Sequence, residues 1–263
     1  MPRKKKKGSQ EYSPFTTMAR PFYSNNKAQA GGSTMERLYR GIRKFQQEKF
    51  LPDSQFYANL ANGQSPDTLF FTCSDSRMDP NLITQSRPGE LFIVRNIGNI
   101  IPVCNDLHKK TCTAAAIEFA LNLLKISTII VCGHSTCGAV KAMFLDDKEF
   151  SEMTNLKEWI DTAIVVKERA LKCTESMAYA DIITAAEKEH IKTQLEHLKS
   201  YPLIIKAMKE GKVSLQGWHY DIGTGAVYIY NEAKDSLEEI RCADEDDRCT
   251  EEEPFGEPCG DLG

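Results

Sequence analysis

Residues 68–77 read Thr-Leu-Phe-Phe-Thr-Cys-Ser-Asp-Ser-Arg, and residues 127–138 read Ser-Thr-Ile-Ile-Val-Cys-Gly-His-Ser-Thr-Cys-Gly. Each stretch opens with a short apolar run without polar alternation, as expected for a strand that is covered on both faces. A similar run occupies residues 90–95, and a helical pattern rich in Ala and Leu follows at about residues 113–124. The order strand, helix, strand is typical of a parallel sheet.

The rest of the chain extends this pattern. Amphipathic stretches at residues 156–171 and 182–198 predict helices, and β-like runs follow at residues 212–220 and 226–230. Between these two runs, the glycines of residues 221–225 provide what a tight turn needs. We therefore predict an α/β fold with a central, mainly parallel β-sheet flanked by helices.

We divide the chain into one domain and two tails. Residues 1–33 carry a basic cluster and little apolar periodicity, which predicts a disordered basic tail. Residues 34–243 form the domain, which begins with an amphipathic helix to about residue 50, capped by Ser33 or Thr34. Residues 244–263 are acidic and aperiodic, which predicts a second disordered tail. No motif residue lies in either tail, so we expect both to be dispensable for chemistry.

Composition excludes several classes of protein. Of the 263 residues, 41% are hydrophobic and 27% are charged, which is ordinary for a soluble globular protein. No apolar run is long enough to cross a bilayer, and no apolar segment of a secretory signal follows the basic start, so no membrane is expected. The odd number of cysteines, nine, favours a reducing cytoplasm. The middle of the chain is close to charge balance, so nucleic acid is not expected as a partner.

The basic start of the chain allows more than one interpretation. The run from Arg3 to Lys7 fits a nuclear-type address or a nucleic-acid patch, and the first 33 residues also fit an organellar transit peptide. We favour a solvated tail of a cytoplasmic protein. Organellar targeting stays open at this point.

The chemistry-bearing residues follow two of the predicted strands. Ligands bind at the carboxyl ends of the strands in an open parallel sheet, so Cys73, His134 and Cys137 are expected to meet in one crevice. Two thiolates and one imidazole are a zinc-type ligand set, and three protein ligands leave one position of a tetrahedral ion open. Asp75 is the candidate for that position, and Arg77 stands where it can hold the Asp75 carboxylate in a bidentate pair.

Two states of the site follow. Either Asp75 ligates the ion, or Arg77 restrains Asp75 and water takes the fourth position. The second state is catalytic, because zinc lowers the pKa of bound water to about 7 and the resulting hydroxide attacks an electrophilic carbon. The spacing alone does not specify the reaction.

Together these stretches closely resemble the β-class carbonic anhydrases. The similarity covers roughly residues 35–232 and extends to the runs Arg-Pro-Gly-Glu-Leu-Phe-Ile-Val-Arg-Asn at 87–96 and Ala-Ile-Glu-Phe-Ala at 116–120. The resemblance implies four parallel strands plus a C-terminal antiparallel strand, surrounding helices, and a homodimer or higher assembly of dimers. It implies zinc-dependent reversible hydration of carbon dioxide to bicarbonate and a proton. It also implies one zinc ion per chain on Cys73, His134 and Cys137, with Asp75 and Arg77 orienting the hydroxide.

The resemblance also suggests a subtype and a substrate pocket. Gln64 stands where plant-like members carry a glutamine that points into the carbon dioxide pocket, and Phe92, Ile97 and Phe119 match the apolar lining of that pocket. Phe70 stands where members with a non-catalytic bicarbonate pocket carry tryptophan. This departure favours the plant-like subtype.

Several points stay open in the sequence. The proton shuttle is not identified, and the candidates by residue type are His108, His190, His197 and His219. A zinc deaminase is excluded, since neither His-x-Glu nor Pro-Cys-x-x-Cys occurs. Two alternatives are kept. One is a zinc hydrolase of the same fold that acts on another small linear electrophile such as carbon disulfide, and the other is a non-catalytic zinc-binding regulatory protein.

Overall fold

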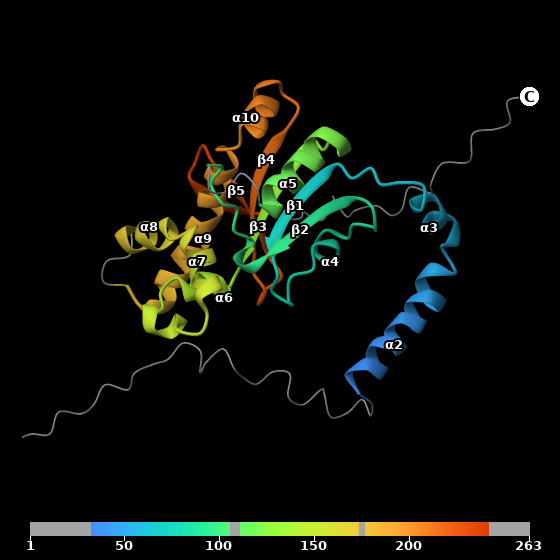
Figure 1. Ribbon diagram of the computed structural model, residues 1–263, viewed down its shortest axis with the longest axis horizontal. Coiled ribbons are helices and arrows are strands. Elements are labelled where there is room, and N and C mark those ends of the chain that lie inside the picture. The colour runs from blue at the N-terminus through green and yellow to red at the C-terminus, as the bar shows by residue number, and fades with distance from the viewer. Residues whose placement is uncertain (1–32, 106–110, 174–176, 242–263) are drawn as a thin grey trace, which may run out of the picture.

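The computed structural model describes residues 33–105, 111–173 and 177–241, and its centre is a six-stranded sheet in the order β2-β1-β3-β4-β5-β6 (Figure 1). The strands are β1 Thr68–Cys73, β2 Leu91–Asn96, β3 Thr128–His134, β4 Ser214–Tyr220, β5 Val227–Asn231 and β6 Ser236–Glu239. Strands β2, β1, β3 and β4 are parallel, whereas β5 and β6 each run antiparallel to the preceding strand. The predicted mainly parallel α/β sheet is thus confirmed. Apart from Ser33, the two predicted tails lie outside the described residues.

Helices connect and cover these strands. They are α2 Thr34–Phe45, the π-helical turn η1 Gln46–Phe50, α3 Ser54–Leu60, α4 Pro80–Thr84, the 3₁₀ turn η2 Ile97–Asn99, α5 Cys112–Glu118, the π-helical turn η3 Phe119–Leu124, α6 Gly138–Ala142, the 3₁₀ turn η4 Asp147–Phe150, α7 Thr154–Asp161, α8 Val165–Cys173, α9 Tyr179–Leu198 and α10 Pro202–Lys209. Within the described ranges, no helix combines the length and the apolar character that a membrane span requires.

Alternate residues of the central strands pack into two apolar layers, one on each face of the sheet. Leu69 and Ile129 pack with residues of α5 and α10. Phe70 and Ile130 point the other way and pack with residues of α6, α7 and α8. Helix α9 contributes to both layers, and ten of its twenty residues are buried. Burial on both faces explains why the strands lack polar alternation.

The sheet has one more strand than the resemblance implied. Strand β6 pairs with β5 in the register Tyr230 to Leu237, so two antiparallel strands follow the four parallel ones. Its sequence, Ser-Leu-Glu-Glu, is short and polar and carries no strand signal of its own. The turn decides its position, because the side chain of Asn231 accepts the backbone N–H groups of Ala233 and Lys234 and so reverses the chain.

The predicted helix at residues 156–171 is instead two helices, α7 and α8. At the break, the Thr162 hydroxyl donates to the Trp159 carbonyl at 2.7 Å. The backbone N–H of Thr162 donates to the same carbonyl at 3.3 Å, and the Ala163 N–H donates to the Ile160 carbonyl, so the hydrogen bonds here span three residues in place of four. Ala163 is fully buried at this bend. The amphipathic pattern continues across the break, so periodicity alone did not reveal it.

The first helices form an arm that extends away from the sheet (Figure 1). Ser33 caps α2 in a capping box with Glu36, as one of the two predicted caps. No residue of α2 is buried, and its apolar side chains Leu38, Ile42 and Phe45 are exposed. At the base of the arm, Arg87 pairs with Asp53 and its guanidinium lies 3.6 Å from the ring centre of Phe56. The arm is therefore anchored at its base, and its apolar stripe is exposed in the part of the chain that the structure describes.

Candidate metal centre

Three ligand atoms meet at one edge of the sheet. Cys73 ends β1, His134 ends the neighbouring parallel strand β3, and Cys137 is the residue just before α6. The Sγ atoms of the two cysteines and a ring nitrogen of His134 all lie within 4.8 Å of one another. All three residues are buried. The parallel pairing of β1 and β3 thus produces the crevice that the two sequence motifs predicted.

The donor set fits a zinc ion. His134 Nδ1 lies 2.9 Å from the Ser135 carbonyl oxygen, which can only accept, so Nδ1 carries the proton. Nε2 is therefore left with a free lone pair, and it is buried without a hydrogen-bond partner among the described residues. A histidine oriented through its other nitrogen is the usual arrangement of a metal ligand. Two sulfurs and one imidazole nitrogen match the preference of zinc.

The two thiols share their protons unequally. The hydrogen bond from Cys137 is the largest cause that lowers the pKa of Cys73, to about 4, although burial acts in the opposite direction. Backbone N–H groups of Asp75 and Gly98, each 3.4 Å from Cys73 Sγ, also favour the thiolate. The same pair interaction raises the pKa of Cys137. A divalent cation removes this asymmetry because a coordinating thiol is deprotonated outright.

Asp75 is held beside the cluster by Arg77. The guanidinium Nε and Nη2 atoms donate to the two carboxylate oxygens at 2.9 and 2.7 Å, and the Arg77 backbone N–H donates to Oδ1 at 2.9 Å. These bonds, led by the side-chain pair, lower the pKa of Asp75 to about 2. Its Oδ2 atom lies 3.9 Å from His134 Nε2. A carboxylate that is ionised near neutral pH and held by a bidentate pair therefore stands next to the three ligand atoms.

The turn between the two ligands of the second motif supports Arg77 from the other side. Thr136 accepts from Arg77 Nη1 through its hydroxyl at 3.1 Å and from Nη2 through its carbonyl at 3.4 Å. Thr136 adopts φ 58°, a left-handed conformation that a β-branched residue rarely takes. Strained backbone of this kind is kept where the surroundings fix it, and here it directs both oxygens of Thr136 at the guanidinium.

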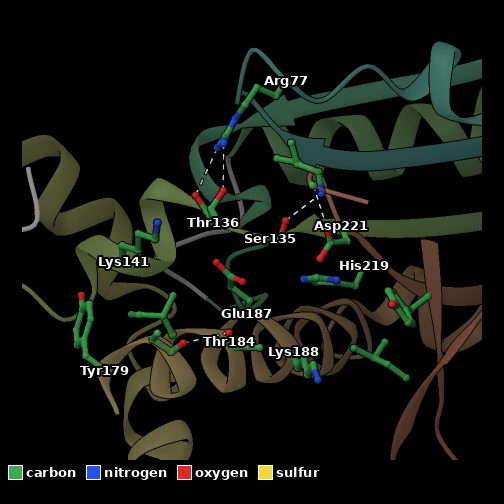
Figure 2. A pocket seen from close by; sticks show the side chains of 16 residues that line it. Arg77, Ser135, Thr136, Lys141, Tyr179, Thr184, Glu187, Lys188, His219 and Asp221 are labelled. Carbon is green, nitrogen blue, oxygen red and sulfur yellow. Dashed lines mark hydrogen bonds between the residues drawn. The ribbon is translucent and has the colours of Figure 1, made fainter. Parts of the chain in front are cut away.

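A cleft of about 780 Å³ lies behind this turn, between it, α9 and the β4–β5 hairpin (Figure 2). Figure 2 shows Arg77, Ser135 and Thr136 along one wall, and Glu187 and His219 projecting from the opposite side. His219 is 6% exposed, and its Nε2 atom has no hydrogen-bond partner in the described chain. The turn of Ser135 and Thr136 therefore lines this cleft and also connects the candidate ligands His134 and Cys137.

Three further residues hold the site, and the sequence did not single them out. Arg95 donates from Nε to the Cys73 carbonyl at 3.1 Å and from Nη2 to the Asp75 carbonyl at 2.7 Å. Trp159 donates from Nε1 to the Ile97 carbonyl at 2.7 Å. Glu187 accepts the backbone N–H of Cys137 at 2.9 Å. Arg95 had a signal, since it lies in the run at 87–96, but no local pattern marks Glu187 or Trp159.

Of the four residues assigned to the substrate pocket, Gln64, Ile97 and Phe119 are exposed, whereas Phe92 is half-buried against one apolar layer of the core. The rings of Phe92 and Phe119 stack with centres 5.7 Å apart and planes inclined by 20°. Ile97 is 48% exposed, and Gln64 is exposed in the loop between α3 and β1. Pockets for small molecules usually enclose most of the ligand surface, which an exposed apolar wall does not do. The described chain supplies these residues but does not enclose them.

The histidines considered as proton shuttles differ in their surroundings. His108 lies outside the described residues. His190 and His197 are buried packing residues of α9, hydrogen-bonded to backbone carbonyls at 2.6 Å. Burial lowers the pKa of His190 and of His219 to about 4. Neither of these two rings accepts a proton readily near neutral pH.

Comparisons with known proteins agree with this geometry. Residues 68–227 match the family model described as carbonic anhydrase. The chain is 40% identical over 197 residues to the carbonic anhydrase of a Synechocystis species, covering 75% of this chain and 71% of the relative. It is 34% identical over 194 residues to the carbonic anhydrase of Helicobacter pylori, covering 73% of this chain and 88% of the relative.

Solved structures give the same result at the level of the fold. The β-carbonic anhydrase CcaA superposes with a TM-score of 0.76 at 38% identity, over 79% of this chain and 100% of that chain. A tetrameric β-carbonic anhydrase of Sordaria macrospora superposes with a TM-score of 0.67 at 26% identity, over 74% of this chain and 96% of that chain. With its Cys-His-Cys cluster, its sheet and these relatives, the chain belongs to the carbonic anhydrase family, in its β class.

Proposed function

We propose that this chain is a zinc enzyme that converts carbon dioxide and water to bicarbonate and a proton, reversibly. The observation that supports this most is a three-ligand cluster beside a restrained carboxylate, Asp75, which a purely structural zinc site does not need. Cys73, His134 and Cys137 are the proposed ligands of one zinc ion per chain. Bound zinc would lower the pKa of a coordinated water to about 7 and so supply hydroxide near neutral pH.

Asp75 and Arg77 are proposed to orient the attacking oxygen. Because the pKa of Asp75 is lowered to about 2, its carboxylate is ionised at neutral pH and acts only as an acceptor. Both of its oxygens are committed to Arg77, which keeps the carboxylate from turning freely toward the ligand cluster. Arg77 is itself fixed by Thr136, so this restraint is built into the metal-binding turn.

Phe92, Ile97, Phe119 and Gln64 are proposed to receive carbon dioxide. The substrate is small, linear and apolar, so an apolar wall admits it without strong binding. The amide of Gln64 would donate an N–H to one substrate oxygen as negative charge develops there. Trp159 holds the Ile97 carbonyl, and this contact fixes the backbone from which the Ile97 side chain projects.

We propose that the working unit is a homodimer or a higher assembly of dimers. Two exposed apolar regions of the chain support this: the stripe of α2, with Leu38, Ile42 and Phe45, and the wall formed by Ile97 and Phe119. Contiguous exposed apolar surface commonly marks an interface. A partner that covers the wall would also enclose the substrate pocket.

Two finer assignments are proposed. A reducing compartment, the cytoplasm, agrees with the free thiols of Cys73, Cys104, Cys112, Cys132 and Cys137. The plant-like subtype agrees with Phe70, which is fully buried and packs edge-on against Trp218 with ring centres 5.8 Å apart. For this subtype we expect activity that rises with pH through a single ionisation and shows no cooperative inhibition by bicarbonate.

A stopped-flow carbon dioxide hydration assay on zinc-quantified protein tests the proposal. We expect turnover that scales with zinc content and disappears on chelation. Hydrolysis of carbon disulfide in place of hydration would favour the same-fold hydrolase. Full zinc occupancy with neither activity would leave a non-catalytic zinc-binding protein and would overturn the proposal.

A further inference from the structure

Glu187 and His190 lie one helical turn apart on the buried face of α9. Glu187 contacts the backbone of Cys137, and His190 contacts the backbone of Gly98, which is hydrogen-bonded to Cys73. Glu187 is 5% exposed, and its Oε1 atom accepts the backbone N–H of Cys137 at 2.9 Å. Figure 2 shows its carboxylate pointing from the helix toward the turn that carries Ser135 and Thr136. A buried carboxylate is costly unless it is hydrogen-bonded, so this contact fixes where the turn lies above the helix.

His190 acts on the other cysteine through one intermediate residue. Gln194 lies 3.3 Å from His190 Nδ1, and its amide donates there, so the proton of the ring sits on Nε2. Nε2 then donates to the Gly98 carbonyl at 2.6 Å, and the Gly98 N–H in turn donates to Cys73 Sγ at 3.4 Å. Gly98 has φ 76° and lies so close to Ala139 that a side chain does not fit, so the segment is held tightly on both sides.

We infer that Glu187 and His190 are positioning residues for the metal centre: from one face of α9 they set where the two cysteine sulfurs stand. This inference rests on the proposal that Cys73, His134 and Cys137 hold zinc. Residues 187, 190 and 194 follow the spacing of one helix face, so a single rigid element bears on both thiolates. Groups that orient metal ligands typically change metal affinity by about 10- to 100-fold when removed.

Zinc release to an excess of a colorimetric chelator measures this role directly, without relying on turnover. We expect Glu187→Ala and His190→Leu to release zinc about 10- to 100-fold faster than the parent protein. Glu187→Gln keeps an acceptor for the Cys137 N–H, and His190→Gln keeps a donor for the Gly98 carbonyl. Both conservative variants should release zinc at close to the parent rate.

Ile191→Val is the matched control, because it trims a fully buried side chain of the same helix without touching either contact. Urea unfolding of every variant shows how far stability alone has changed. If Glu187→Ala and His190→Leu release zinc no faster than Ile191→Val, the two residues serve the fold only and the inference is wrong. Should Glu187→Ala fail to fold, Glu187→Met fills a similar volume without an acceptor and is measured in its place.

The absorption spectrum of the cobalt-substituted protein gives a second readout. Its ligand-field bands depend on the arrangement of the two sulfurs, and we expect them to shift in Glu187→Ala and His190→Leu but not in Ile191→Val. Unchanged bands in both variants would count against the inference. A parent protein that binds zinc but does not hydrate carbon dioxide would refute the proposed function and leave this test intact. A parent protein that binds no zinc would refute both.

Discussion

Helices α9 and α2 are both amphipathic, but α9 has ten buried residues and α2 has none. The buried face of α9 carries polar side chains that form hydrogen bonds with the backbone around the ligand cluster. Glu187 accepts the Cys137 N–H, and His190 donates to the Gly98 carbonyl. The apolar stripe of α2 stays exposed in the described chain, and the ring contacts of Phe45 are with Phe50 and Tyr57 of the arm itself. The candidate ligands Cys73, His134 and Cys137 are thus brought together within one chain, whereas the arm and the proposed substrate wall are left open. We therefore assign the ligand cluster to the single chain, and the covering of the α2 stripe to the proposed assembly of chains.

The largest expected effect is on zinc content and hydration activity, when one of the three proposed ligands is removed. Each of Cys73→Ala, His134→Ala and Cys137→Ala leaves two protein ligands, too few for a stable tetrahedral site. We expect zinc content to fall from one ion per chain to less than about a tenth, with hydration falling in parallel. Metal analysis after dialysis against chelator checks this. Full zinc in Cys137→Ala would remove that residue from the site.

Removing Arg77 should stop turnover while leaving the metal in place. In Arg77→Ala the Asp75 carboxylate loses its bidentate partner beside a dication and is expected to fill the fourth position. The hydration rate near neutral pH should fall by about 100- to 1000-fold at unchanged zinc content, and raising the pH should recover part of it. X-ray absorption at the zinc edge should count one additional protein oxygen. Wild-type turnover, or loss of zinc as in the ligand variants, would contradict the restraining role of Arg77.

A charge placed on the exposed apolar stripe of α2 tests whether this stripe forms the proposed dimer interface. Ile42→Asp puts a carboxylate on the exposed apolar stripe of α2, where burying an aliphatic side chain contributes about 2 kcal/mol to association. We expect the dimer to dissociate at about 30-fold higher protein concentration, measured by analytical ultracentrifugation, with hydration lost from the monomer. Arg40→Gln makes the same change in net charge on the polar side of α2 and should leave the assembly intact. Equal assembly of both variants would separate the arm from the interface.

The smallest effect concerns pH and the buried ring of His219. Burial, the largest cause, lowers its pKa to about 4, below the value of about 6.5 in an unfolded chain. The unfolded chain therefore binds the proton first, so stability is full above about pH 6.5 and is lost as the pH falls toward 4. One such group changes the free energy of unfolding by up to about 1.4 kcal/mol per pH unit.

His219→Phe removes this titration and should flatten the pH dependence of the free energy of unfolding by that amount between about pH 4.5 and 6. Urea unfolding at saturating zinc measures it, because protonation of the zinc ligands then contributes equally to both proteins. An unchanged slope would mean that the ring of His219 does not titrate as its burial requires.

The sequence by itself determined the parallel sheet and the place of the cluster formed by Cys73, His134 and Cys137. Apolar runs without alternation required strands covered on both faces, and the ligands directly after two of them had to meet at one sheet edge. The local spacing of Asp75 and Arg77 also predicted their pairing, since two residues apart they remain neighbours in any turn. These are short-range consequences of chain geometry.

Only the tertiary structure decided how that cluster is supported. Glu187 reaches Cys137 across fifty residues and His190 reaches Gly98 across ninety-two, and no periodicity in α9 distinguishes these side chains from others that pack. Strand β6 likewise depends on pairing with β5, because Ser-Leu-Glu-Glu has no preference for a strand. Contacts between distant segments arise from how helices and strands pack, and a linear pattern records which face of an element is buried but not what that face touches.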